Sequence, residues 1–354
     1  MKIVIIIGDI TKTGGTERAT INVSNLLCES HNVVIFSLGM AGTPFFKVDN
    51  RVILRFLGLG EIPTSIAKKV KWFSNLYKIL KVNLQVYLPD VIIGQGHNIS
   101  SILPFVKTKQ SSVFACEHID YASIPFVSRS LMKISYPKLT GLIVLSQIAK
   151  KKLQKLNSNI FIIPNSIPFT VEKTAELTNP KMIMVGRIST EKGYERLVPI
   201  AKKLQEEFPD WMIDIFGNGP LKSEIEKSYT TAGLNNITIN DPVRDIGNKY
   251  LDSSIHLITS YNEAMPMVIL EAQYCGLPVV GFRCEGTESL VNDGINGFIV
   301  DSHEDFYEKL KILILERKKR LEMGLKGRQA TKIYDSKHIK LQWENIVSGL
   351  QQKY

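Results

Sequence analysis

The stretch "KMIMVGRISTEKGYERL" (residues 181–197) joins an apolar run, typical of a buried strand, to a segment with helical character. Arg187 and Lys192 lie five positions apart at this junction, one preceded and the other followed by a glycine. Ligands of α/β sheets bind at the carboxyl ends of the strands. An arginine suits forked contact with phosphate oxygens, and a lysine acts as a mobile point charge. The junction is therefore either a site that binds a diphosphate or the start of a helix with solvated charges. Other parts of the sequence are needed to distinguish these two interpretations.

Similar apolar runs recur along the chain, with helix-length polar segments between them. Because the runs are continuous rather than alternating, they are typical of parallel strands covered by helices on both faces. The runs lie at 2–7, 33–38, 91–94, 113–116, 142–146 and 160–165, then at 181–186, 212–217, 237–240, 255–259, 279–282 and 297–300. They predict an α/β protein of two doubly wound domains facing a central cleft, joined by the polar linker "TVEKTAELTNP" (residues 170–180).

Length and composition agree with two globular domains, since the 354 residues are 44% hydrophobic and 22% charged. The four cysteines show no metal-like or paired spacing and are expected to be reduced thiols. The sequence contains no signal-peptide pattern and no apolar run of spanning length, which predicts a cytoplasmic protein.

The charge is uneven, with 20 Lys and Arg against 8 Asp and Glu in residues 1–170, and 24 against 26 in the remainder. A basic first half suits an anionic lipid surface, a nucleic acid or an anionic small molecule. Residues 65–84 read as a basic amphipathic helix for an anionic membrane, with Trp72 or Phe73 reaching outward. An ordinary helix packed on the sheet accounts for them equally well. Nucleic acid is not expected, because the sequence has no helix-turn-helix, zinc or RNP pattern.

A second group of residues lies in "NEAMPMVILEAQYCGLPVV" (residues 262–280), where Glu263 and Glu271 stand eight positions apart. Pro266 fits the first turn of a helix, so the amides from Met265 to Val268 would form an anion site at the helix N-terminus. Carboxylates beside a phosphate site suit a nucleotide sugar, because they accept hydrogen bonds from sugar hydroxyls. The alternative is one acid favoured by the helix dipole and another exposed on the helix.

Together the R-x4-K and E-x7-E patterns resemble the retaining glycosyltransferases of family 4, which have the GT-B fold. "GGTER" (14–18), "EH" (117–118), "IPNSI" (163–167), "GNGP" (217–220) and "VNDGINGFIV" (291–300) also resemble segments of that family, so the resemblance covers nearly the whole chain. It implies a basic, membrane-facing acceptor-binding domain over residues 1–169 and a donor-binding domain over 170–330. Helices over 331–354 would cross back to the first domain.

The resemblance also implies roles for single residues. Arg187 and Lys192 would neutralise the diphosphate of the donor, Glu271 would bind its ribose, and Glu263 and His118 would contact the transferred sugar. The residues expected at the donor are Gly15, Arg187, Lys192, Val243, Glu263, Ala264, Met265, Pro266, Met267, Val268 and Glu271. Those expected at the acceptor are Glu17, His97 and Asp120.

Two of these assignments have alternatives, and one residue departs from the family pattern. His118 follows an apolar strand and could be an ordinary hydrogen-bonded core histidine. Glu17 could simply open a helix capped by Thr16. Ala264 departs from the glycine that many relatives have there, and its small side chain is expected to keep the loop intact with a tighter approach to the phosphates.

The sequence offers no D-x-D pair for a metal-bridged diphosphate, and cations with a helix terminus can do that work electrostatically. We therefore expect a metal-independent enzyme without a cofactor, in which retention of configuration is implied by the resemblance alone. The predicted reaction moves a hexose or N-acetylhexosamine from a UDP-sugar to a glycan acceptor, polyprenyl-diphosphate-linked, in surface polysaccharide synthesis. The enzyme would work as a peripheral protein on the inner face of the cytoplasmic membrane. The alternative is a nucleotide-sugar epimerase of the same fold.

Overall fold

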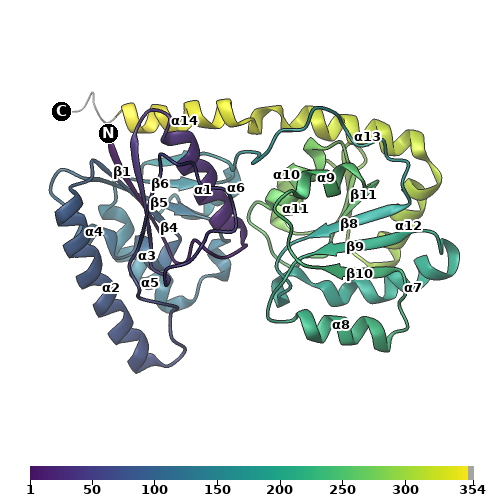
Figure 1. Cartoon of the computed structure of the whole chain (residues 1–354), viewed down its shortest axis with the longest axis horizontal. Helices are drawn as coiled ribbons and strands as arrows, with labels where there is room; N and C mark the ends of the chain where they lie inside the picture. Colours follow the sequence, from purple (N-terminus) through teal and green to yellow (C-terminus); the bar gives the residue numbers. More distant parts are fainter. Residues whose placement is uncertain (350–354) are drawn as a thin grey trace. The chain divides into compact units, whose positions relative to one another are not determined.

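The computed structural model describes residues 1–349, which form two compact units (Figure 1). Unit 1 contains Met1–Ser166 and the chain from Ser336 onward, and unit 2 contains Ile167–Asp335. The expected linker over 170–180 lies inside unit 2, where Ala175 and Leu177 are buried and the Ala175 amide donates to the Cys275 carbonyl at 2.8 Å. Of the predicted C-terminal helices, α14 (Ser336–Ser348) belongs to unit 1, and residues 350–354 lie outside the described residues.

Unit 1 is built on a parallel sheet of seven strands in the order β3-β2-β1-β4-β5-β6-β7. The strands are β1 (Lys2–Ile7), β2 (Asn32–Ser37), β3 (Ile53–Phe56), β4 (Val91–Gln95), β5 (Ser112–Glu117), β6 (Gly141–Val144) and β7 (Ile160–Ile162). All except β3 were predicted from continuous apolar runs. β3 lies at the edge of the sheet, and the exposed Ile53 begins it, so its short sequence lacks the signal of a buried strand.

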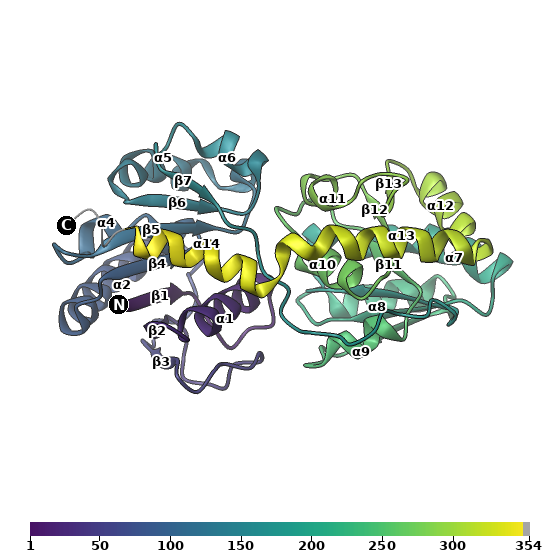
Figure 2. The same cartoon turned by 90° about the horizontal axis from the view of Figure 1, so that it is seen from above.

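Helices cover both faces of this sheet (Figure 2). α1 (Gly15–Leu27) and α14 pack on one face, where Ile339 and Trp343 join the buried cluster. The other face carries α2 (Ile66–Tyr87), α3 (His97–Ser100), α4 (Leu103–Val106), α5 (Phe126–Ser135) and α6 (Gln147–Leu153). The expectation of an outward Trp72 or Phe73 is wrong. Trp72 is only 7% exposed, and Phe73 packs against the same cluster.

Unit 2 contains a second parallel sheet, with six strands in the order β10-β9-β8-β11-β12-β13. The strands are β8 (Lys181–Val185), β9 (Met212–Phe216), β10 (Ile237–Asn240), β11 (Ile255–Ile258), β12 (Val279–Phe282) and β13 (Gly297–Val300). Each matches a predicted run, so the doubly wound α/β architecture is confirmed. The helices are α7 (Leu197–Glu207), α8 (Lys222–Thr231), α9 (Ile246–Leu251), α10 (Met267–Tyr274), α11 (Glu285–Leu290), α12 (His303–Leu315) and α13 (Arg317–Ala330).

The strand orders place one switch point in each sheet. In unit 2 the chain runs outward from β8 through β9 to β10, then returns to β11 on the other side of β8. In unit 1 the corresponding gap lies between β1 and β4. Ligands of doubly wound sheets bind beyond the carboxyl ends of the strands at such a point. Residues of a ligand site are therefore expected at the carboxyl edges of the two sheets, beside these switch points.

Across residues 1–349, no helix combines the length and apolar character needed to cross a membrane.

Candidate functional site

The loop after β8 holds Lys192 at the switch point of unit 2. Lys192 ends a short 3-10 turn, and Gly193 follows with a left-handed φ of 61°. A Cβ at Gly193 would lie 2.5 Å from the Thr259 carbonyl oxygen, so backbone angle and space both require glycine. The Thr259 hydroxyl donates to the Lys192 carbonyl at 2.8 Å, which ties the loop to the end of β11.

The loop after β9 supports the same segment from the other side. The Gly186 amide donates to the Phe216 carbonyl at 3.1 Å, and the Ile188 amide donates to the Asn218 carbonyl at 3.0 Å. A Cβ at Gly219 would lie 2.2 Å from the Ile188 carbonyl oxygen. The "GNGP" segment therefore fixes the backbone around Arg187, whose side chain is exposed at this edge.

Glu263 faces Lys192 across the switch point. The Lys192 ammonium forms an ion pair with the Glu263 carboxylate, and the Ser260 hydroxyl donates to the same carboxylate oxygen at 3.0 Å. Their side chains are 23% and 13% exposed, so the pair is partly shielded from water. A pocket at the ends of β8 and β11 is lined by Met184, Val185, Lys192, Tyr194, Leu257, Ile258, Thr259, Ser260, Glu263 and Val268.

Glu191 brings a second carboxylate to the two cations. Burial by itself raises the pKa of Glu191, but the hydrogen bond from Ser189 and the charges of Lys192 and Arg187 outweigh it and lower that pKa. The site therefore contains two cations, Arg187 and Lys192, close to the carboxylates of Glu191 and Glu263. An anionic ligand would bind here by taking over the role of a carboxylate.

Helix α10 begins at Met267 with Pro266 as its N-cap, so the expected place of Pro266 in the first turn is wrong by one residue. This helix follows the loop after β11, so its first amides lie at the carboxyl edge of the sheet, and the Ile269 amide donates to the Pro266 carbonyl at 3.1 Å. The loop before α10 packs closely against Gly286. A Cβ at Gly286 would lie 2.5 Å from the Glu263 Cβ and 2.6 Å from Pro266 Cδ, so the loop leaves no space for a side chain there.

The two predicted glutamates have different surroundings. Glu263 lines the pocket, whereas Glu271 is fully buried and accepts a hydrogen bond from the Tyr250 hydroxyl at 3.2 Å. The structure thus does not bring both carboxylates to the pocket that contains Lys192. Of the remaining residues expected at the donor, Val268 lines this pocket, Met265, Pro266 and Met267 are buried, Ala264 is half-buried, and Val243 packs against the apolar cluster beside α9.

In unit 1, His118 follows β5 and contacts the end of β4. Its Nε2 lies 2.5 Å from the Gln95 side-chain oxygen, which can only accept a hydrogen bond. Nε2 therefore carries the proton, and Nδ1 keeps a lone pair that can accept from a hydroxyl. Burial lowers the pKa of His118 to about 4, so the imidazole is neutral at physiological pH. His97 begins α3 directly after β4, is buried, and has its pKa lowered by burial.

The other predicted residues of unit 1 lie at the same sheet edge. Gly15 is the first residue of α1, and Glu17 lies in the first turn. Gly14 is the N-cap of this helix, so the alternative with Thr16 as the cap is wrong. Asp120 caps a 3-10 turn by accepting from the Ala122 amide at 3.2 Å, and it pairs with Lys152 at 2.7 Å.

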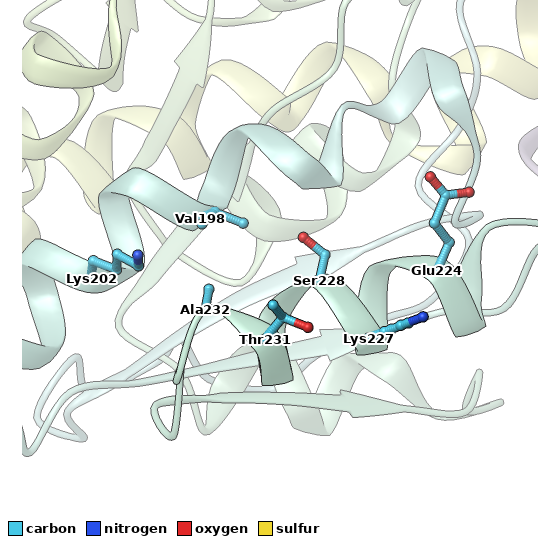
Figure 3. Close-up of a pocket in the computed structure, with 7 residues that line it drawn as sticks. All are labelled: Val198, Lys202, Glu224, Lys227, Ser228, Thr231 and Ala232. Carbon is cyan, nitrogen blue, oxygen red and sulfur yellow. The ribbon is translucent and has the colours of Figure 1, made fainter.

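Two further features bear on binding. A surface hollow of about 480 Å³ lies between α7 and α8 and is lined by Lys202, Glu224 and Lys227 with smaller side chains (Figure 3). It lies away from the ends of β8 and β11, so it is separate from the Lys192 pocket. In the described part of the chain, no three His, Cys, Asp or Glu side chains come together in a group that could hold a metal ion.

Comparisons with known proteins bear on these two units. Residues 167–330 match the family model of glycosyl transferases group 1. Two curated relatives align over nearly their full length. One is an amylovoran biosynthesis glycosyltransferase of Erwinia amylovora (27% identity, 98% of this chain and 99% of the relative). The other is an α-1,4-N-acetyl-D-galactosaminyltransferase of Campylobacter jejuni, named for an undecaprenol-diphosphate-linked glycan (26% identity, 99% of each chain).

Solved structures establish the fold. The HepE protein of Anabaena, solved in complex with UDP and glucose, matches with a TM-score of 0.80 and 16% identity over 99% of this chain and 100% of that chain. The chain has the GT-B fold. The family match and the full-length relatives support glycosyltransferase activity.

Proposed function

We propose that the chain is a retaining family 4 glycosyltransferase that moves a hexose or N-acetylhexosamine from a UDP-sugar to a glycan. The proposed acceptor is linked to a polyprenyl diphosphate, the product is a surface polysaccharide, and the enzyme works at the inner face of the cytoplasmic membrane. The names of the two relatives support this setting, since one is named for amylovoran biosynthesis and the other for transfer to an undecaprenol-linked glycan. Both are named transferases, so the epimerase alternative is not favoured.

The observation that carries the proposal is the Lys192–Glu263 ion pair at the switch point of unit 2. It offers an ammonium for a diphosphate and a carboxylate for sugar hydroxyls at one edge of the sheet. Arg187 adds a second cation, and the α10 N-terminus adds backbone amides. As the bond between sugar and phosphate breaks, negative charge grows on the leaving diphosphate, and these groups stabilise it electrostatically.

In unit 1 we assign His118 to the transferred sugar, with its neutral Nδ1 accepting a hydroxyl hydrogen bond. We place the acceptor near His97, Glu17 and Asp120. The acceptor hydroxyl attacks the anomeric carbon from the face that the phosphate leaves, and a leaving phosphate oxygen takes its proton. Configuration is retained in this step without a covalent intermediate.

A thermal-shift experiment tests the donor site. Wild type is expected to be stabilised by UDP or a UDP-sugar, with and without EDTA, and the shift should weaken in Arg187→Ala. Lys202→Ala is the matched control, because it removes a cation from the hollow between α7 and α8. If Lys202→Ala lost the UDP-induced shift and Arg187→Ala kept it, UDP would bind in the hollow between α7 and α8, and the proposed donor site would be contradicted.

A transfer assay tests the reaction itself. UDP release that requires a polyprenyl-diphosphate-linked glycan, and a product whose anomeric configuration by NMR matches that of the donor, are the expected results. Release of UDP without an acceptor at the same rate, or an inverted product, would contradict the proposal.

A further inference from the structure

Helix α5 of unit 1 turns an apolar face to solvent. Phe126, Val127 and Ile134 are 74%, 79% and 61% exposed, and Leu131 is 38% exposed. At 100° per residue these four positions fall within one arc of the helix, with Ser130 between them. The opposite side holds Met132 and Ser135, which are buried against the sheet. The apolar arc is therefore a continuous outer surface, which we call the α5 face.

The segment that begins with α5 is basic. From residue 121 to residue 171 the sequence contains no aspartate or glutamate, and its cations are Arg129, Lys133, Lys138, Lys150, Lys151, Lys152 and Lys155. The Lys138 ammonium lies 4.8 Å from the centre of the Phe105 ring of α4, so a further exposed aromatic side chain stands at the C-terminal end of α5. Lys107 and Lys109 follow Phe105 and are exposed.

This combination selects one kind of partner. A second copy of the same face would bring like charges together, and their repulsion opposes self-association. Nucleic acid is recognised by arginine and stacked aromatic rings, whereas this face presents mainly aliphatic side chains. Exposed apolar side chains in a basic segment match the interface of a bilayer, where the chains enter the acyl boundary and the ammonium groups meet phosphate headgroups.

We propose that the α5 face docks unit 1 on a bilayer of anionic lipids. The site deepens the proposed function, because α5 begins soon after His118 and Asp120, at the sheet edge assigned to the acceptor. Docking there holds that edge near the headgroups, where the diphosphate of a lipid-linked glycan lies. This is a different surface from α2, whose buried Trp72 faces the sheet.

Vesicle sedimentation of the full chain tests the docking. Wild type is expected to bind vesicles of phosphatidylglycerol and phosphatidylcholine, to bind pure phosphatidylcholine at least about tenfold less, and to be released by high salt. The variant with Phe126→Ser, Val127→Ser and Ile134→Ser should lose at least about tenfold in vesicle affinity, because it removes the inserted apolar area. Its UDP binding should equal that of wild type.

The matched control changes α2 to the same extent. Ile66, Val70 and Val82 are 81%, 67% and 61% exposed, and replacing all three by serine should leave vesicle binding within about twofold of wild type. A Phe126→Trp variant gives a direct readout, since its fluorescence should shift to shorter wavelength with anionic vesicles and be quenched by brominated lipid.

Several results would overturn the docking site. These are no binding to anionic vesicles, equal loss in the α2 variant, an unshifted Phe126→Trp spectrum, or a dimer in solution that the α5 variant abolishes. Failure of the proposed function gives a different pattern. A chain that binds vesicles through α5 but transfers no sugar refutes the function alone, whereas one that transfers sugar without vesicle binding refutes the docking alone.

Discussion

At the scale of single residues, Lys192 is already paired with a carboxylate within the protein. Its ammonium is paired with Glu263, and both side chains are partly shielded. A donor diphosphate must replace this carboxylate, which then becomes available to the sugar hydroxyls. We predict that Glu263→Gln binds UDP about fivefold more tightly, because the competing charge is gone and a partly exposed ion pair contributes about 1 kcal/mol. Calorimetric titration with UDP measures this change.

The same variant should lose most of its transfer activity, since the carboxylate assigned to the sugar is absent. Glu195→Gln serves as the control, because Glu195 accepts from the Tyr261 hydroxyl at 2.8 Å at the same edge and makes no ion pair with Lys192. Unchanged or weaker UDP affinity in Glu263→Gln would show that the ion pair does not compete with the nucleotide.

Glu117 gives unit 1 a predictable pH dependence. Burial raises the pKa of Glu117 to about 7, although the hydrogen bond from the Tyr136 hydroxyl lowers it. The folded chain thus keeps a proton that the unfolded chain loses near pH 4.5, so its stability falls as the pH rises from about 4.5 through 7. The total effect is at most about 3 kcal/mol.

Glu117→Gln removes this titration while keeping an acceptor for Tyr136. We predict that the melting temperature of the variant, minus that of wild type, increases between pH 5 and about pH 7 and then levels off toward pH 8. The lowered pKa of His118 acts in both proteins and cancels in the difference. A difference that stays constant over this range would mean that Glu117 is ionised in the folded chain throughout.

Residue spacing predicted some of these contacts and not others. The R-x4-K and E-x7-E patterns identified Lys192 and Glu263 because both follow strands that end at one sheet edge. The contact of Gln95 with His118 depends on the register of β4 against β5, which pairs Gln95 with Cys116. Registers of parallel strands are set by tertiary packing, so a single sequence does not reveal them. Ser260 lies only three residues before Glu263, and its contact was missed because it depends on the conformation of the loop after β11.

At the scale of elements, close backbone approach shapes the donor loop. A Cβ at Gly219 would lie 2.2 Å from the Ile188 carbonyl oxygen and 2.8 Å from the Ile188 amide nitrogen. We predict that Gly219→Ala moves the Arg187 segment and weakens UDP binding at least about tenfold, as expected when a positioned ligand contact is lost. Gly8→Ala is the control, because a Cβ at Gly8 meets nothing within 4 Å. Calorimetric titration with UDP measures the affinity of both variants, and equal affinities of Gly219→Ala and Gly8→Ala would contradict the prediction.

Continuous apolar runs were sufficient to predict every strand except β3. Such runs arise because a parallel strand is buried on both faces, and an edge strand escapes this condition. The start of α10 was misplaced by one residue because proline is favoured both at the first helical position and in the turn before it. The outer face of α5 was not predicted, since a sequence does not say which side of a short helix meets the sheet.

At the scale of the whole molecule, the chain builds unit 1 from two distant segments. α14 returns to pack on α1, with Ile339, Trp343 and Val347 buried. Lys340 forms an ion pair with Glu29, and His31 Nε2 lies 2.8 Å from the Glu344 carboxylate. Only the family resemblance indicated C-terminal helices over 331–354 and the domain on which they pack. Membership of a unit is decided by long-range contacts, which local pattern does not contain.

This arrangement predicts that the two units respond separately to a change in α14. Trp343→Ala should destabilise unit 1 by about 3–5 kcal/mol, as removal of a buried tryptophan typically does, while UDP binding by unit 2 stays within about twofold. Urea unfolding in a Trp211→Phe background reports on unit 1 through Trp72, and UDP titration reports on unit 2. Leu341→Ala is the control within α14, because Leu341 is 60% exposed. A parallel loss of UDP affinity in Trp343→Ala would mean that α14 supports the donor site as well, and the division into two independent units would fail.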